Sequence, residues 1–335
     1  MTAIDFVGLG ATVGCSVADA WFLRRRKPVP ASWKARVMTP DYAASAIAAG
    51  NYARIVAART TNLVREAQER HGCSPTVAAA LGRLLTGAAL VGVGLTGRER
   101  VVMQINSDGP VRGLTAEAYA GGRVRGYPGR ARAELPLNAG GKFDVSGIVG
   151  RGFLHVTRIY ETGLPYTSAV PLASGEIGED LAYYFAKSEQ VPTVVAVGVL
   201  ANPAGVIAAG GVLAQLMPGA EPDVIDALEA GAHSMEHVTG LVRRGQTPEE
   251  LVRAMAGRLS PRITHALPLS FACPCDRSRV AKAIVGLGLD QLSEMACGED
   301  DTEATCDFCG KRYYFSPREI GEILEHAAGA AEDSS

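Results

Sequence analysis

The stretch SPTVAAALGRLLTGAALVGVGL, residues 74–95, decides the fold of the larger part of this chain. Ser74 is a preferred helix N-cap residue, and Pro75 suits the first helical turn. Nearly all the residues that follow are small or apolar, which indicates a helix buried on all sides. The glycines interrupt it and it is too short to span a bilayer, so we interpret it as the core helix of a globular domain.

The segments around this helix alternate between the two kinds of secondary structure. A second helix is expected at residues 60–72, with a Thr cap and Gly72 as its stop, and a third at 174–190. The expected strands are 52–58, 99–106, 111–119, 123–127, 153–160, 193–200 and 206–216. Turn residues such as SDGP and ANPAG separate several of the strands. Strands in hairpins with helices between them predict an α+β domain.

The expected secondary structure changes after MPGAEPD, residues 217–223. Residues 222–260 are expected to be helical, with Thr247 and Glu250 as a capping box. An apolar stripe is formed by Val224, Ile225, Leu228, Met235, Val238 and Leu241. Gly231 and Gly240 each lower the helix propensity by roughly 1 kcal/mol relative to alanine. We hypothesise that this linker packs on the α+β domain only while the C-terminal part holds it there.

Residues 1 to about 45 contain no element that would anchor them. We interpret them as a disordered extension, or as the result of an upstream start codon with Met38 as the true start. The basic residues follow the first apolar stretch instead of preceding it, which argues against a secretion signal.

The amino-acid composition limits the classes of function that this chain can have. The chain has 335 residues, 47% of them hydrophobic and 20% charged, with a net charge of −2. This is a globular composition, and the charge gives no sign of a polyanion-binding protein. We expect a protein of the cytoplasm, bound to neither membrane nor nucleic acid. Thiols stay reduced there, so clustered cysteines indicate metal or redox chemistry.

Two cysteine motifs stand close together near the C-terminal end. Cys273 and Cys275 form C-x-C, and Cys306 and Cys309 form C-x-x-C. Zinc takes four thiolates in a tetrahedron, and a domain of a few dozen residues usually needs a metal or disulfides. The four cysteines are therefore expected to hold zinc. Cys297 lies between the motifs and is an alternative ligand.

Two other cysteines, Cys15 and Cys73, are interpreted as small apolar residues or surface thiols. A C-x-C pair can also close into a strained disulfide, which is easily reduced and suits a redox switch. Asp276 is expected to cap a helix after the first motif. Ser316 and Glu319 are expected to form a capping box after the second.

Two further readings remain open. His233 and His237 flank Glu236 in H-x-x-E-H, a motif that on one helix can hold catalytic zinc in a peptidase. A zinc ribbon that binds nucleic acid is the other. Residues 271–335, however, contain 13 acidic and 6 basic residues. Their net charge of about −7 would repel the phosphates of a nucleic acid. The isolated histidines His71, His155, His265 and His326 are expected to have surface or core roles.

From about residue 50 to about 325 the sequence resembles the heat shock protein 33 family of redox-regulated bacterial chaperones. The resemblance rests on the two cysteine motifs and on long ordered matches. These are RHGCSPTVAAALGRLLTGAAL, GPVRGLTAEA, GEIGEDLAYYFAKSEQVPT and AAGGVLAQLMPGA. The first 45 residues fall outside it, and Cys297 is not part of the family pattern.

The resemblance implies a non-enzymatic, ATP-independent holdase of the stress response that binds unfolding proteins, often as a homodimer when oxidised. It implies one zinc ion per chain in the reduced, inactive state, on Cys273, Cys275, Cys306 and Cys309. It implies disulfides Cys273–Cys275 and Cys306–Cys309 after oxidation, with release of the zinc. The absence of a P-loop agrees with ATP independence.

Together these observations predict an α+β fold: a mixed N-terminal domain with a hairpin-rich sheet, a helical linker and a small C-terminal zinc domain. The expected ranges are 1–45 for a disordered extension, 46–218 for the α+β core domain and 219–262 for the linker. The zinc-binding redox-switch domain is expected at 263–328, with a tail at 329–335.

Overall fold

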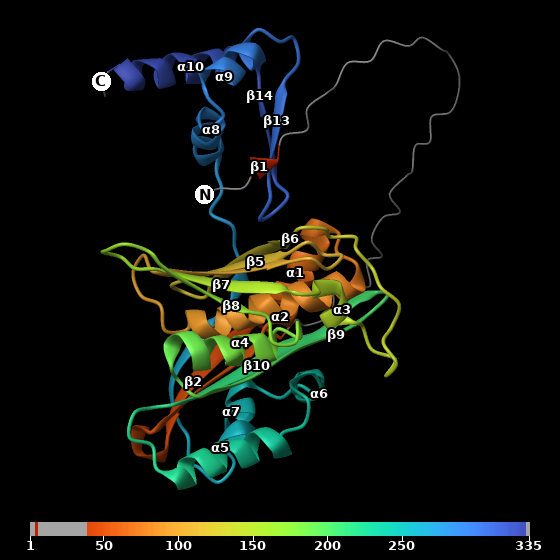
Figure 1. The fold of residues 1–335 in the computed structure, drawn as a ribbon, viewed down its shortest axis with the longest axis vertical. Coiled ribbons are helices and arrows are strands. Elements are labelled where there is room, and N and C mark those ends of the chain that lie inside the picture. Colours follow the sequence, from red (N-terminus) through yellow and green to blue (C-terminus); the bar gives the residue numbers. More distant parts are fainter. Residues whose placement is uncertain (1–3, 6–38, 333–335) are drawn as a thin grey trace. The chain divides into compact units, whose positions relative to one another are not determined.

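The structure, a computed structural model, describes residues 4–5 and 39–332. It divides into two compact units. The larger unit comprises residues 40–274 together with 307–310. The smaller comprises the other described residues, and the ribbon of both is drawn in Figure 1. Both units contain α-helices and largely antiparallel β-sheets, which confirms the predicted α+β fold class.

The larger unit contains two sheets. The five-stranded sheet has the order β11-β2-β3-β10-β9 and the six-stranded sheet the order β12-β6-β5-β4-β7-β8. The strands of the first are β2 (Tyr42–Ala48), β3 (Ala53–Arg59), β9 (Thr193–Asn202), β10 (Gly205–Leu216) and β11 (Arg262–Pro268). Those of the second are β4 (Arg100–Ser107), β5 (Leu114–Tyr119), β6 (Arg123–Pro128), β7 (Gly152–Ile159), β8 (Tyr166–Pro171) and β12 (Ser270–Phe271). Every pairing is antiparallel except that of β12 with β6.

Helix α2 (Pro75–Gly92) packs against strands of both sheets and forms the centre of this unit (Figure 1). The Ser74 side chain accepts a hydrogen bond from the Val77 amide, as the sequence predicted. By length and composition α2 is the one helix among the described residues that could cross a membrane, but 83% of it is buried in the protein. A helix with apolar residues all round is stable when protein surrounds it.

Helix α1 (Thr61–His71) ends at Gly72, which has φ +61°. The expected cap from Thr60 is absent, because its hydroxyl bonds to Thr86 instead, at 2.7 Å. Asp41, which lies just before β2, caps the helix instead. Its carboxylate accepts a hydrogen bond from the Leu63 N–H at 2.7 Å. Asp41 is buried, and desolvation raises its pKa to about 6.

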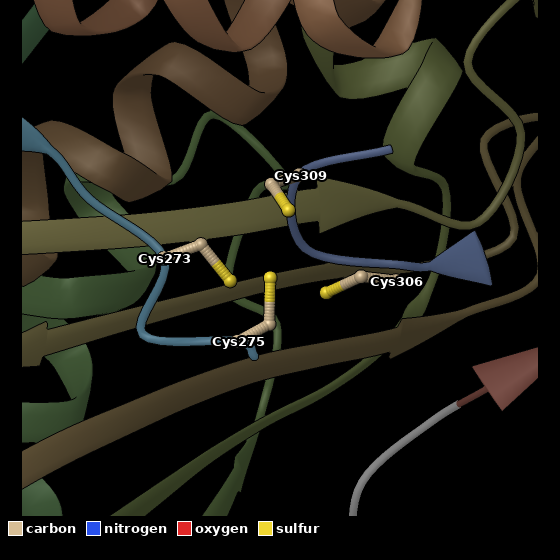
Figure 2. A group of neighbouring side chains, drawn as sticks. All are labelled: Cys273, Cys275, Cys306 and Cys309. Carbon is tan, nitrogen blue, oxygen red and sulfur yellow. The ribbon is translucent and has the colours of Figure 1, made fainter. Parts of the chain in front are cut away.

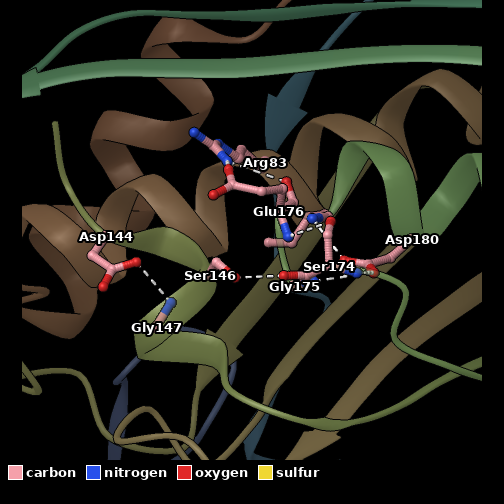
Figure 3. Close-up of polar contacts among 9 residues, drawn as sticks. Arg83, Asp144, Ser146, Gly147, Ser174, Gly175, Glu176 and Asp180 are labelled. Carbon is pink, nitrogen blue, oxygen red and sulfur yellow. Dashed lines mark hydrogen bonds and ion pairs between the residues drawn. The ribbon is translucent and has the colours of Figure 1, made fainter. Parts of the chain in front are cut away.

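The helix expected at 174–190 begins later, as α4 (Gly178–Tyr184), and continues as a π-helical turn over Phe185–Glu189. Figure 3 shows the reason. The buried Asp180 carboxylate accepts backbone N–H groups from residues 173, 174, 175 and 177, which holds this stretch as a loop. Nearby, Arg83 of α2 pairs with Glu176, and the short helix α3 (Val145–Val149) is capped by Asp144.

The linker forms three helices, α5 (Pro222–Ser234), α6 (Val238–Arg243) and α7 (Pro248–Ala256). They share one apolar cluster with β2, β3 and β10, so the expected packing on the α+β domain is present. The Thr247–Glu250 capping box forms as predicted. Within the expected stripe, Val224, Leu228, Val238 and Leu241 are buried, while Ile225 and Met235 are half-buried.

Two expected boundaries differ from the structure. Strand β2 begins at Tyr42, inside the segment expected to be an extension, and crosses the boundary at 45/46. Strand β11 pairs with β2, so the segment from 262 to 268 belongs to the larger unit and not to the zinc domain expected from 263. The short edge strand β12 follows. The rest of the expected extension, residues 1–3 and 6–38, lies outside the described residues, as does the end of the tail at 333–335.

The smaller unit has a three-stranded sheet of order β1-β13-β14 and three helices. The strands are β1 (Ile4–Asp5), β13 (Thr302–Cys306) and β14 (Arg312–Phe315), and the helices are α8 (Arg277–Val285), α9 (Leu289–Ala296) and α10 (Pro317–Glu332). Asp276 caps α8, and Ser316 and Glu319 bond reciprocally at the start of α10, both as expected. β1 pairs with β13, although it lies in the segment expected to be a disordered extension.

Candidate metal centre

Four cysteine side chains converge in one cluster. The sulfur atoms of Cys273, Cys275, Cys306 and Cys309 lie within 4.8 Å of one another. In Figure 2 the four side chains point toward a common centre, two from each motif. Among the described residues this is the one group of three or more potential metal-ligating side chains of this kind.

Local structure fixes each motif. Cys273 follows β12, and the Ala272 amide donates to the Val124 carbonyl of β6 at 2.9 Å. Cys275 is followed directly by Asp276, the cap of α8. Cys306 ends β13, and its amide donates to the Lys311 carbonyl at 3.0 Å, which closes the turn between the strands. Gly310 adopts φ +68°, a left-handed conformation that glycine adopts without strain.

The cluster fits a tetrahedral metal. Four thiolates at about 2.3 Å from a zinc ion stand about 3.8 Å apart, which the observed spread allows. Such a complex carries two excess negative charges, which hydrogen-bond donors to the sulfurs would stabilise. Arg125 Nη1 donates to Cys273 Sγ at 3.4 Å, and Tyr313 Oη donates to Cys275 Sγ at 3.2 Å. Four thiolates complete a tetrahedral shell, so no further ligand from solvent is needed. Cys306 and Cys309 are also buried.

Arg125 is itself held by a buried ion pair. Its guanidinium donates to Glu117 Oε2 at 2.6 and 2.8 Å, and the Tyr119 hydroxyl donates to the same oxygen at 2.6 Å. Burial opposes the charge on Arg125, but Glu117 raises its pKa above the ordinary value. A fixed cation therefore faces the first cysteine of the cluster.

The C-x-x-C turn carries an aromatic anchor. Phe308 is 6% exposed, with the Arg125 guanidinium 3.6 Å from its ring centroid and the Tyr127 ring 4.9 Å away, edge-on. His71 contacts the same region: its Nε2 hydrogen-bonds with the Gly126 carbonyl, and desolvation lowers its pKa. These contacts attach the turn to β6 and to the end of α1.

Sequence reasoning missed Arg125, Tyr313 and Phe308 as parts of the centre. Arg125 lies on β6, far from the motifs in sequence, and nothing in its own neighbourhood indicates a thiolate partner. The aromatic residue within CDFC was the one usable signal, because an apolar side chain on a metal-binding turn needs a surface to cover it.

The remaining cysteines lie outside the cluster. Cys297 is exposed and ends α9, so the structure does not bring it together with the other four. Cys73 is buried, and desolvation raises the pKa of its thiol to about 12, as for an inert core residue. Cys15 falls outside the described residues.

The zinc-peptidase interpretation requires the two histidines of H-x-x-E-H to lie on one helix, and this requirement is not met. α5 ends at Ser234, and Met235 and His237 have extended backbone with ψ 124°, so His233 and His237 do not share a helical face. Glu236 is paired with Arg244 at 2.6 Å, and His233 Nδ1 bonds to the Glu229 carbonyl. These partners give the histidine and the glutamate structural roles.

The chain is similar in sequence to known proteins. A sequence model of the family described as Hsp33 protein matches residues 41–316. The chain is 40% identical over 290 residues to the 33 kDa chaperonin of Geobacillus sp. (strain WCH70), covering 86% of this chain and 98% of that protein. It is 39% identical over 282 residues to the 33 kDa chaperonin of Bacillus subtilis (strain 168), covering 84% and 97%.

A solved structure agrees with these sequence matches. The crystal structure of the 33 kDa chaperonin, a heat shock protein 33 homologue, from Thermotoga maritima superimposes with a TM-score of 0.81 at 34% identity, covering 87% of this chain and all of that one. The family match spans most of the chain, and both relatives are aligned over almost their whole length. The chain therefore belongs to the Hsp33 family.

Proposed function

We propose that this protein is a redox-regulated, ATP-independent chaperone that holds unfolding proteins and prevents their aggregation. The observation that carries the proposal is the convergence of four cysteines in a chain of this family. The relatives are named chaperonins, which supports a binding function in place of catalysis.

The reduced protein is proposed to hold one zinc ion through Cys273, Cys275, Cys306 and Cys309. A four-thiolate, closed, mostly buried donor set favours zinc over oxygen-preferring cations such as magnesium or calcium. When bound, zinc would cross-link the two motifs and supply on the order of 10 kcal/mol to the folding of the smaller unit. In this state the chaperone is inactive.

Oxidation would convert each motif into a disulfide, Cys273–Cys275 and Cys306–Cys309. Each thiolate pair loses two electrons to one molecule of hydrogen peroxide, which takes up two protons from solvent and becomes two molecules of water. The sulfurs then no longer serve as thiolate ligands, so the metal leaves. Two disulfides that close such short loops restrict the unfolded chain little, so the smaller unit loses most of its stabilisation.

The linker helices α5, α6 and α7 have an apolar surface that would be uncovered if the smaller unit lost its stabilisation and released them. Their side chains toward the five-stranded sheet include Leu251, Val252 and Met255, none of which is exposed to solvent. Burial of each such side chain contributes roughly 1.5–3 kcal/mol. Release of the linker would expose both these residues and the sheet beneath them, and unfolding clients bind to exposed apolar surface.

The proposed partners are unfolded or partly unfolded proteins. The oxidised protein is proposed to form a homodimer, and its proposed location is the cytoplasm. Binding to nucleic acid is disfavoured by the net charge of about −7 over residues 271–335.

The test is an aggregation assay with a thermally unstable client such as citrate synthase. Light scattering would be recorded with reduced protein and with peroxide-oxidised protein, each with its zinc content measured. We expect suppression by the oxidised, zinc-free form only. Cys297→Ser, a matched control outside the cluster, should behave like wild type. Equal activity of reduced zinc-bound and oxidised protein would refute redox control, and inactivity of both would refute the chaperone function.

A further inference from the structure

A second site lies in the larger unit, away from the cysteines. A cavity of about 250 Å³ opens between β3 and β10 of one sheet, β4 and β7 of the other, and the C-terminal end of α2. Apolar residues form part of its lining, the apolar wall, and include Leu90, Leu95, Phe185 and Leu213. The polar residues of the lining are Arg54, Glu99, Arg100, Arg158 and Gln215.

Arg54 is the unusual residue of this lining. It lies on β3 directly opposite Gln215 of β10, and its one hydrogen bond goes to Gln215 Oε1 at the long distance of 3.5 Å. No ion pair joins Arg54 to a carboxylate anywhere in the described part of the chain. Desolvation, and then the charge of Arg158, lower its pKa below the ordinary value. A half-buried guanidinium beside another cation is unfavourable unless an anion compensates it.

The neighbouring acidic groups are already engaged. Glu189 pairs with Arg158 Nε at 2.9 Å, and Glu99 accepts both the amide and the hydroxyl of Thr96. The C-terminal end of α2 carries about half a negative charge, which offsets Arg54 only in part. Three arginines and Glu99 line the cavity, and Glu189 pairs with one of these arginines. Three positive charges against two carboxylates leave one positive charge in the cavity without a counter-charge.

The cavity's size and chemistry select a ligand class. At about 30 Å³ per water, it holds roughly eight waters, below the range of roughly 300–1,000 Å³ for drug-sized ligands. Guanidinium groups from strands of both sheets suit a phosphate, whose several oxygens can accept hydrogen bonds from more than one arginine. The apolar wall suits a small ring or short hydrocarbon beside it.

We propose that this cavity binds a small phosphate monoester, with the phosphate on Arg54 and Arg158 and the organic group against Leu90 and Leu213. The ligand would join the two sheets through their arginines. This site is independent of the proposed chaperone function, because it uses neither the cysteines nor the linker helices.

The probe is phenyl phosphate, compared with inorganic phosphate, in calorimetric titrations at constant ionic strength. Phenyl phosphate is expected to bind more tightly, and Arg54→Gln to weaken it at least about tenfold, since a charged hydrogen bond contributes about 1.5–3 kcal/mol. Arg98→Gln is the control, because Arg98 is exposed, lies two residues from Arg100 and does not line the cavity.

A second measurement does not depend on a variant. Phenylglyoxal labelling of wild type, read by mass spectrometry, should show that phenyl phosphate protects Arg54 and leaves Arg98 reactive. Absence of binding, or binding that Arg54→Gln leaves unchanged, would overturn the site. Equal affinity for the two probes would overturn the role of the apolar wall.

Discussion

Gly231 decides how closely the first linker helix can approach the third. It lies buried in α5, and a Cβ atom placed on it would stand 2.1 Å from the Met255 carbonyl oxygen of α7. That oxygen belongs to helix backbone and cannot move alone. Alanine at this position must therefore push α5 away from α7.

The expected effect of Gly231→Ala combines two opposing terms. Overpacking of this kind costs about 1–3 kcal/mol, while the higher helix propensity of alanine returns about 1 kcal/mol. A net loss of up to roughly 2 kcal/mol raises the population of undocked linker up to roughly 30-fold. Under the proposed function, the reduced protein should then suppress client aggregation without oxidant. Its melting temperature should fall by up to roughly 8 °C.

Gly240→Ala provides the matched control. The Cβ added there would meet Glu236 Oε1 at 2.6 Å, the end of an exposed and flexible side chain that can turn away. This variant should melt no lower than wild type and stay inactive when reduced. The reasoning fails if Gly231→Ala and Gly240→Ala behave alike in both the light-scattering and the melting measurement.

Three further outcomes are expected. Cys297→Ser should retain one zinc per chain in a colorimetric release assay, because its sulfur lies outside the cluster, whereas the double variant Cys306→Ser, Cys309→Ser should retain none. Asp41 has a folded-state pKa of about 6 against an ordinary 3.8, so the stability it contributes is present below about pH 4 and is lost as the pH rises to about 6. Denaturant titrations should show a fall of up to roughly 3 kcal/mol across this window, which Asp41→Asn abolishes; an unchanged pH dependence in the variant would contradict this assignment. Phe308→Ala should speed zinc release by a thiol reagent on the order of tenfold, because it removes the cation–π contact with Arg125. Tyr314→Ala, whose ring is half exposed, should not change the rate, and equal rates for both variants would exclude the anchoring role of Phe308.

Local signals in the sequence predicted local structure well. Ser74, Thr247 with Glu250, and Asp276 cap helices as expected, because a cap depends on residues within one turn. The start of α4 was misplaced, because Asp180 satisfies the backbone amides before it and so competes with the helix. The expected cap at Thr60 failed for a similar reason, since Asp41 reaches the first turn of α1 from another element.

Long-range pairing was the part that the sequence could not supply. β2 is rich in alanine, which is uncommon in strands, and β11 has mostly exposed side chains without an apolar alternation. β11 is a strand because β2 lies beside it, about 220 residues away in the chain, and β2 lies between β11 and β3. The spacing of the cysteines predicted their convergence, but their donors Arg125 and Tyr313 are fixed by sheet register.

The path of the chain offers a physical link between the cysteines and the linker. From the end of α7 it runs through β11, at the edge of the five-stranded sheet, and β12, at the edge of the six-stranded sheet, to Cys273. β11 buries little, since only Ile263 and Leu267 are half-buried, and its register with β2 shifts between Ile263 and His265. Backbone hydrogen bonds along one edge therefore hold it, and such segments open at the lowest free energy. α7 packs on β2 and β3 and is far better buried. A disturbance at Cys273 would thus reach β11 before α7, and the linker could respond to the metal centre without touching it.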